Sequence, residues 1–173
     1  MKVYSEVLPQ ELLNLCKEDV LKKQKESVWQ PNQFFWDKNI LKNIDGACYV
    51  AKITDNKLKN LLTAELSIAF SNYDYDFLDF QYYIWDSYSG ISAHDDSLYQ
   101  FGATLYLNSN ILENGGLFIW QDEECPENFY RCINPQENMM VVNDNREKHL
   151  VTHISPHAKE YRHTLQIWGR LNK

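Results

Sequence analysis

The sequence is short of positive charge and has no long hydrophobic run. Its 173 residues contain 17 Lys and Arg against 24 Asp and Glu, a formal net charge of −7. Binding to a nucleic-acid backbone needs a clustered basic surface, so this balance argues against nucleic acid as a partner. No apolar run approaches the roughly 18 residues of a membrane span, and no secretory signal pattern opens the chain. We therefore expect a cytoplasmic protein with no nucleic-acid or membrane partner.

Cysteine is also scarce. Cys16, Cys48, Cys125 and Cys132 are scattered, form no Cys-x-x-Cys motif and do not have zinc-site spacing. We expect reduced thiols, as is usual in the cytoplasm, although Cys125 and Cys132 could pair in an oxidising compartment.

Apolar and aromatic residues are plentiful enough for a packed core, at 44% and 14% of the chain. At this length one domain, residues 1–173, is the simplest arrangement. The patterns divide it into a mixed, helix-bearing N-terminal support over about 1–78 and a β-rich catalytic core over about 79–170.

Two helices and one strand are expected in the N-terminal support. Residues 9–25 carry apolar side chains at helical spacing, with lysines toward the end, and residues 57–70 carry a second such stripe after Asp55. Residues 46–53 read as a short strand.

From residue 79 onward, short β-rich runs alternate with turn residues. This pattern predicts a mainly β protein with flanking N-terminal helices (α+β), folded as a sandwich or a double-sheet jelly roll. The helices would cover one outer face of a sheet. The expected strands are 80–85, 102–107, 116–120, 130–133, 139–142, 150–154 and 164–168.

Two histidines and an aspartate in the C-terminal half suggest a metal site. His94 and Asp96 are two residues apart, so on a strand their side chains point to one side. Together with His149 they supply two imidazoles and one carboxylate, which can hold a divalent metal on one face and leave the other open. His153 shares strand parity with His149, so alternation alone does not separate these two candidates.

Polar residues also alternate with apolar ones on two of the expected strands. Arg162, Thr164 and Gln166 share one face of the last strand, and Thr104 and Tyr106 share one face of an earlier strand. Polar groups inside a barrel need a ligand, metal or water to satisfy them. The planar fork of Arg162 is suited to a carboxylate.

These motifs resemble the iron(II)- and 2-oxoglutarate-dependent oxygenases, in particular the prolyl-4-hydroxylase-like branch. The resemblance runs from about Tyr82 to Gly169, half of the chain. Its parts are Gly-x-x-x-His-x-Asp at 90–96, the strand 103–108, the Asn-Gly-Gly-Leu-Phe turn at 114–118, His-Leu-Val-Thr at 149–152, and Arg-x-Thr-Leu-x-Ile-Trp at 162–168.

The resemblance implies a double-stranded β-helix, the cupin-like jelly roll, and a set of site residues. His94, Asp96 and His149 would be the iron ligands, and Arg162 would pair with the distal carboxylate of 2-oxoglutarate. Tyr106 and Thr164 complete the implied cosubstrate site. The string around His149 favours it as the distal ligand, although His153 lies nine residues before Arg162, a spacing that some relatives use.

The implied activity is hydroxylation of an unactivated C–H bond with iron(II), 2-oxoglutarate and O2, releasing succinate and CO2. The substrate would be a small molecule, an amino acid or a peptidyl side chain. Two alternatives stay open: a cupin-like metal enzyme that does not use 2-oxoglutarate, and a non-catalytic jelly-roll binding module. Neither the oligomeric state nor the exact oxidation follows from the sequence. Candidate substrate walls are the aromatic residues Tyr82, Tyr83, Trp85, Tyr88, Tyr99, Phe101 and Trp120.

Overall fold

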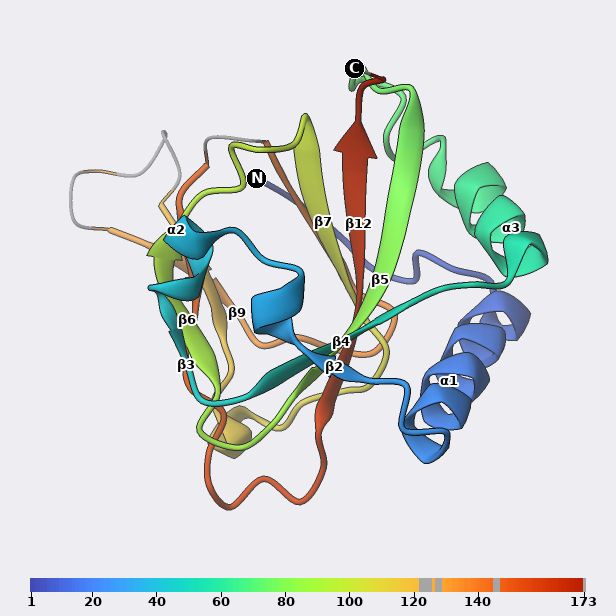
Figure 1. The fold of residues 1–173 in the computed structure, drawn as a ribbon. Helices are drawn as coiled ribbons and strands as arrows, with labels where there is room; N and C mark the ends of the chain where they lie inside the picture. The colour runs from blue at the N-terminus through green and yellow to red at the C-terminus, as the bar shows by residue number, and fades with distance from the viewer. Residues whose placement is uncertain (122–125, 127–128, 145–146, 173) are drawn as a thin grey trace.

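The computed structural model describes residues 1–121, 126, 129–144 and 147–172. Within these residues, two antiparallel sheets and three α-helices form the architecture (Figure 1). The helices are α1 (Gln10–Lys25), α2 (Lys38–Leu41) and α3 (Asn56–Leu66), with short 3-10 turns at Asn32–Phe34 and Leu112–Asn114. The strands are β1 (Lys2–Tyr4), β2 (Gln30–Pro31), β3 (Ile44–Asp45), β4 (Cys48–Lys52), β5 (Phe77–Trp85), β6 (Gly90–His94), β7 (Phe101–Tyr106), β8 (Phe118–Trp120), β9 (Arg131–Ile133), β10 (Met140–Asp144), β11 (His149–Val151) and β12 (Arg162–Arg170).

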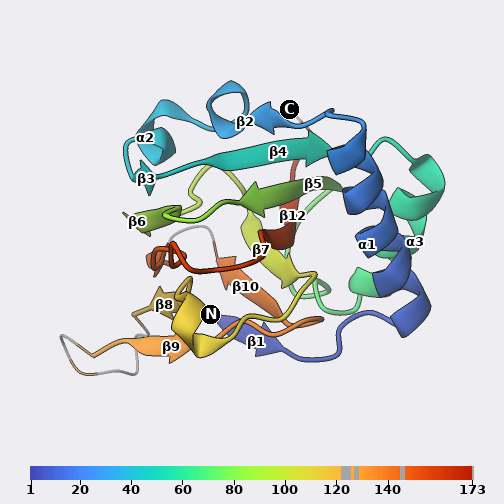
Figure 2. The ribbon, with the colours of Figure 1, turned by 90° about the horizontal axis from the view of Figure 1, so that it is seen from below.

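The described part of the chain is arranged in three layers. The seven-stranded sheet has the order β1-β10-β7-β12-β5-β4-β2, and the five-stranded sheet has the order β3-β6-β11-β8-β9. Helices α1 and α3 lie against one face of the larger sheet, and the smaller sheet lies on its other side (Figure 2). The larger sheet is therefore covered on both faces. The helices cover one outer face of a sheet, as predicted.

Side-chain alternation on the central strands explains both faces of the larger sheet. Leu165 of β12 lies directly between Tyr82 of β5 and Leu105 of β7, and all three are buried in the core beneath the helices. Their neighbours along the chain point the other way, because successive residues of a strand face opposite sides. The inner face therefore carries polar and aromatic side chains, among them Tyr83 and Gln166.

Helix α3 starts where the sequence indicates and ends earlier than expected. The Asp55 side chain accepts hydrogen bonds from the backbone N–H groups of Lys57 and Leu58, an N-cap that fixes the first turn. The helix ends at Leu66. The apolar pattern nevertheless continues to Phe70, because Phe70 lies in the turn that follows the helix and its side chain is buried. Its ring lies 4.6 Å from that of Phe101.

The predicted mainly β class with N-terminal helices is confirmed, with differences in detail. Strands at 2–4, 30–31, 44–45 and 90–94 are additional, and in place of the run expected at 150–154 the strand is His149–Val151. Beyond it, Ile154 forms an isolated bridge with Gly115. Cys125, one half of the conditional disulfide, lies outside the described residues. Within the described ranges no helix has the length and apolar character needed to cross a membrane.

Candidate active site

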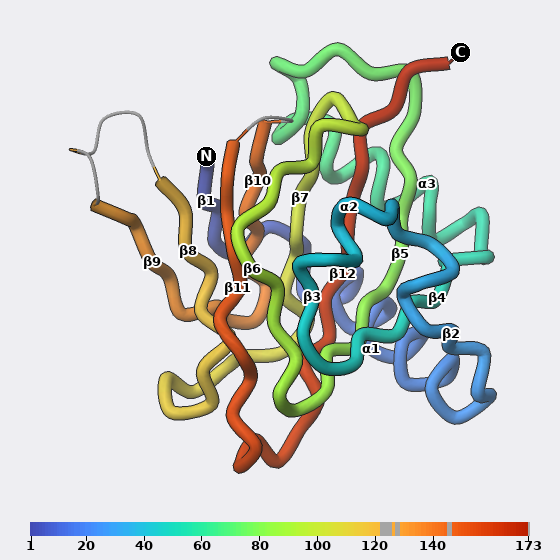
Figure 3. The backbone as a smooth tube through the Cα atoms, turned by 60° about the vertical axis from the view of Figure 1, so that its left-hand side comes forward, coloured from blue at the N-terminus to red at the C-terminus, as the bar shows by residue number. Residues whose placement is uncertain are grey.

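Two histidines face each other across neighbouring strands of the smaller sheet. His94 ends β6 and His149 begins β11, and the two residues are directly paired. The strands run side by side in Figure 3. Their imidazole rings lie 4.3 Å apart between centroids, and the Phe118 ring stacks on His149 at 5.2 Å. Pairing across a sheet thus brings together two residues that are far apart in the sequence.

Backbone carbonyls orient both imidazoles. Nδ1 of His94 lies 3.0 Å from the Ser92 carbonyl oxygen, and Nδ1 of His149 lies 3.0 Å from that of Glu147. A carbonyl accepts only, so each Nδ1 carries the hydrogen and each Nε2 keeps its lone pair. This is the tautomer that a histidine needs to bind a metal through Nε2.

Asp96 supplies the third donor from the turn after β6. Its carboxylate is buried, and Oδ2 lies 3.6 Å from Nε2 of His149 and accepts a 2.7 Å hydrogen bond from Nδ2 of Asn143. One donor atom from each of His94, Asp96 and His149 lies within 4.8 Å of the other two. The three donors fit a divalent metal in number, type and proximity.

Electrostatics favour the neutral imidazole that a metal requires. Burial and the neighbouring His149 hold the pKa of His94 below its usual value, and the Asp96 carboxylate opposes this shift. A neutral His94 needs to lose no proton before its Nε2 can bind a metal.

The structure separates the two candidate distal histidines. His149 is buried beside His94, whereas His153 is exposed and its Nε2 lies 3.1 Å from Oδ2 of Asp45. Strand β11 ends at Val151, so the alternation that related His153 to His149 does not extend that far.

Arg162 lies in the same cavity as the three donors and is held by a glycine turn. Its Nη1 donates to the Gly116 carbonyl oxygen at 2.5 Å, and its Nη2 donates to that of Gly115 at 3.4 Å. Both glycines have positive φ angles, and a Cβ on Gly116 would lie 2.1 Å from Nη2. The turn therefore requires glycine, and it leaves other guanidinium hydrogens free to bind a ligand.

Polar side chains surround Arg162 on the inner face of the larger sheet. The Tyr106 ring lies 5.8 Å from the guanidinium carbon, and burial raises the pKa of Tyr106 to about 12, so its hydroxyl stays protonated at neutral pH. Gln166 donates to the Thr164 hydroxyl at 3.3 Å and accepts from the Thr104 hydroxyl at 2.9 Å. The predicted cosubstrate residues thus line one cavity with the three donors.

Solved structures with this architecture are numerous, although no protein-family model matches the sequence and no curated protein is significantly similar to it. A prolyl-4-hydroxylase from Pseudomonas putida superposes with a TM-score of 0.71 at 15% identity, over 99% of this chain and 92% of that one. A Trichoplax adhaerens prolyl hydroxylase, in complex with a hypoxia-inducible-factor peptide fragment, superposes with a TM-score of 0.75 at 16% identity. The match covers 98% of this chain and 82% of that one. HygX from Streptomyces hygroscopicus, with nickel, 2-oxoglutarate and hygromycin B bound, superposes with a TM-score of 0.68 at 9% identity. That match covers 97% of this chain and 82% of HygX.

The chain has the double-stranded β-helix fold of the 2-oxoglutarate oxygenases. Within this oxygenase fold, the three donors and Arg162 lie between the two sheets, in a cavity whose remaining walls are mainly aromatic and apolar. The further lining residues are Trp36, Asp37, Ile40, Tyr83, Trp85, Ile91, Tyr99, Phe118, Val151 and Trp168.

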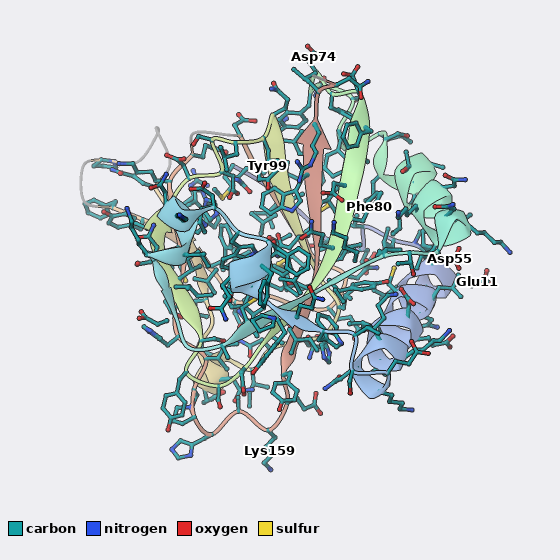
Figure 4. All side chains as sticks on the ribbon, in the orientation of Figure 1. Glu11, Asp55, Asp74, Phe80, Tyr99 and Lys159 are labelled. Atoms are coloured by element: carbon teal, nitrogen blue, oxygen red, sulfur yellow. The ribbon has the colours of Figure 1, made fainter. Side chains whose placement is uncertain are left out.

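Of the aromatic residues that the sequence suggested as cavity walls, some line the cavity and others do not. Tyr83, Trp85 and Tyr99 line the cavity. Tyr99 lies beside the upper ends of β7 and β12 in Figure 4, and its ring stacks on Trp168 at 4.4 Å. The others do not line it: Tyr82 and Phe101 are in the core beneath the helices, Tyr88 is exposed, and Trp120 packs in an apolar cluster with Tyr106 and Phe118.

One wall of this cavity comes from the N-terminal support, which the sequence pattern did not indicate. Trp36 packs on Tyr83 and Trp85 at centroid distances of 5.3 and 5.8 Å. Its indole Nε1 donates to the Tyr83 hydroxyl at 2.7 Å. Indole N–H is only a donor, so the Tyr83 hydroxyl accepts here and its own hydrogen remains available to a molecule in the cavity.

Proposed function

We propose that this protein is an iron(II)- and 2-oxoglutarate-dependent oxygenase that hydroxylates an unactivated C–H bond. The observation that carries the proposal is the meeting of His94, Asp96 and His149 in one cavity with Arg162. Iron and 2-oxoglutarate, when bound, activate O2 to oxidise a C–H bond, with release of succinate and CO2. The protein then has to supply residues that bind the metal and 2-oxoglutarate, orient the substrate and exclude water.

Each of these roles has a residue to fill it. His94, Asp96 and His149 would hold the metal through two imidazole nitrogens and one carboxylate oxygen. Arg162 would bind the distal carboxylate of 2-oxoglutarate, with its guanidinium already oriented by the glycine turn. The protonated hydroxyl of Tyr106 would donate to the same cosubstrate, beside Thr164.

The substrate would enter from the aromatic side of the cavity. The Tyr83 hydroxyl would donate to an oxygen of that substrate, while the Trp36 and Trp85 rings would exclude water. We propose a small molecule, an amino acid or a peptidyl side chain as the substrate, because the cavity is lined by neutral aromatic rings and a few polar groups.

Anaerobic titration of the purified protein with iron(II) and 2-oxoglutarate tests this proposal. We expect a weak metal-to-ligand charge-transfer band in the visible spectrum, followed by aerobic release of succinate. No band would favour a non-catalytic binding module. A band unaffected by Arg162→Ala would show that Arg162 is not the residue that binds 2-oxoglutarate. A screen of metabolite extracts for a product heavier by one oxygen atom, formed only with 2-oxoglutarate, would then identify the substrate and test hydroxylation against desaturation.

A further inference from the structure

The Asp96 carboxylate is held by a side chain from the opposite sheet. Asp96 follows β6 in the smaller sheet, and Asn143 lies on β10 in the larger sheet. Both residues are buried, and the Asn143 amide donates to Oδ2 of Asp96 at 2.7 Å. An ionised carboxylate only accepts, so the amide nitrogen must be the group that faces it.

A glycine makes room for this contact. Asn143, Gly102 and Trp168 form one row across β10, β7 and β12, with Gly102 in the middle. A Cβ on Gly102 would lie 2.8 Å from Oδ2 of Asp96 and 2.7 Å from the Trp168 ring. The carboxylate therefore occupies the space that any other residue at position 102 would fill.

Asp96 has little else to orient its side chain. It lies in a turn rather than in a strand, and its own backbone carbonyl oxygen accepts from the Tyr99 N–H at 3.0 Å. The two histidines differ in this respect, since each imidazole is oriented by a backbone carbonyl within its own segment. The carboxylate instead depends on a contact that spans the two sheets.

We propose that Asn143 is a positioning residue for the metal site, and that Gly102, which has no side chain, leaves room for the Asp96 carboxylate beside it. The amide holds the Asp96 carboxylate toward His94 and His149, so that the three donors are already gathered when a metal arrives. This inference rests on the proposed function, because it assigns Asn143 to the same metal site. Loss of a hydrogen bond that orients a metal ligand weakens metal binding by about 10- to 100-fold.

Metal affinity of the metal-free protein tests this role without using activity. We would titrate cobalt(II) into the wild type, Asn143→Leu and Asn143→Ser, and measure 2-oxoglutarate affinity separately at saturating metal. Leucine has nearly the size and branching of asparagine but no hydrogen-bond donor, and serine is too short to reach Asp96. We expect cobalt affinity to fall at least about tenfold in both variants, with 2-oxoglutarate affinity little changed. Gly102→Ala should weaken cobalt binding as well, because it displaces the carboxylate.

Asn138→Ala is the matched control for a purely structural effect. The Asn138 side chain makes two hydrogen bonds with the backbone of Leu8, and its φ is +61°, so its loss should lower thermal stability and leave cobalt affinity unchanged. Cobalt binding by both Asn143 variants within twofold of the wild type would overturn the inference and leave the proposed function intact. A wild-type protein that binds no metal would overturn both.

Discussion

His149 and His153 show how a single residue's surroundings decide its chemistry. Both are histidines in the same short segment, four positions apart. His149 is buried with its Nε2 lone pair directed toward the Asp96 side, while His153 is exposed and paired with Asp45. The difference comes from the strand that ends between them, which only the folded chain reveals.

Substitution of these two histidines should have opposite consequences. We expect His149→Ala to abolish iron-dependent succinate formation, because one of three metal donors is lost, and His153→Ala to retain most of it. The measurement is succinate released with iron(II), 2-oxoglutarate and O2. Loss of activity in His153→Ala with retention in His149→Ala would reverse the assignment.

The glycine turn at Arg162 predicts a loss of cosubstrate affinity. In Gly116→Ala, the new Cβ would lie 2.1 Å from Nη2 of Arg162, so the guanidinium must move. A charge-assisted hydrogen bond is worth enough that 2-oxoglutarate affinity should fall by about tenfold or more. The measurement is the 2-oxoglutarate dependence of the visible band under anaerobic conditions.

Gly46→Ala serves as the control for backbone strain alone. Gly46 also has a positive φ, of +73°, and a Cβ there would lie 2.6 Å from Cα of Ser89, with backbone atoms of Tyr88 and Ser89, and not Arg162, as its nearest neighbours. We expect this variant to lose stability and keep its 2-oxoglutarate affinity. Equal losses of affinity in both variants would show that strain, and not the guanidinium, is responsible.

At the scale of elements, the segment between β2 and β3 has an unexpected part in the site. It crosses in front of the two sheets in Figure 1 and contributes Trp36, Asp37 and Ile40 to the cavity. The sequence placed this segment in the N-terminal support, since no strand pattern or motif marks it. Its contacts with Tyr83 and Trp85 are long-range, so periodicity along the chain did not indicate them.

Helix α3, in contrast, is a supporting element whose N-cap can be tested. Asp55→Ala removes the acceptor for the Lys57 and Leu58 N–H groups and should lower the free energy of unfolding by about 1 kcal/mol. Chemical denaturation measures this loss, and Asp74→Ala, an exposed acid outside any helix, controls for the lost charge. Equal stability of the two variants would contradict the cap. Figure 4 shows Asp55 near α3 and far from Tyr99, so the visible band with 2-oxoglutarate should be unchanged.

For the whole molecule, burial of histidine makes stability depend on pH. The pKa of His94 is lowered by burial and by His149, and that of His163 is lowered by burial. Between these lowered values and the ordinary value of about 6.5, the unfolded chain binds more protons than the folded one. The free energy of unfolding of the metal-free protein should therefore rise as the pH rises through this interval.

Denaturation of the metal-free protein at a series of pH values measures this slope. His94→Asn should reduce this slope, and the remainder should come from His163. A slope that is unaffected by His94→Asn would show that this imidazole is no harder to protonate in the folded protein than in the unfolded chain.

The mainly β class, both long helices and most strand positions could be predicted because they depend on local patterns. Alternation placed Arg162 and Thr164 on one face, and the His94-x-Asp96 spacing suggested convergence. The residues that line the cavity were harder to predict from the sequence. Tyr82 and Tyr83 are neighbouring tyrosines, yet Tyr82 lies in the core and Tyr83 lines the cavity.

By itself, the sequence determined the residue types of the site, the parity of its strands and the resemblance that links them. Only the tertiary structure decided that His149 rather than His153 meets His94, that Trp36 closes one wall, and that Asn143 reaches Asp96 across Gly102. The physical reason is the separation along the chain over which each kind of interaction acts. Helical and strand periodicity act between near neighbours in the chain, whereas these contacts form between the faces of two sheets, and nothing in the spacing of the residues specifies which side chains meet there.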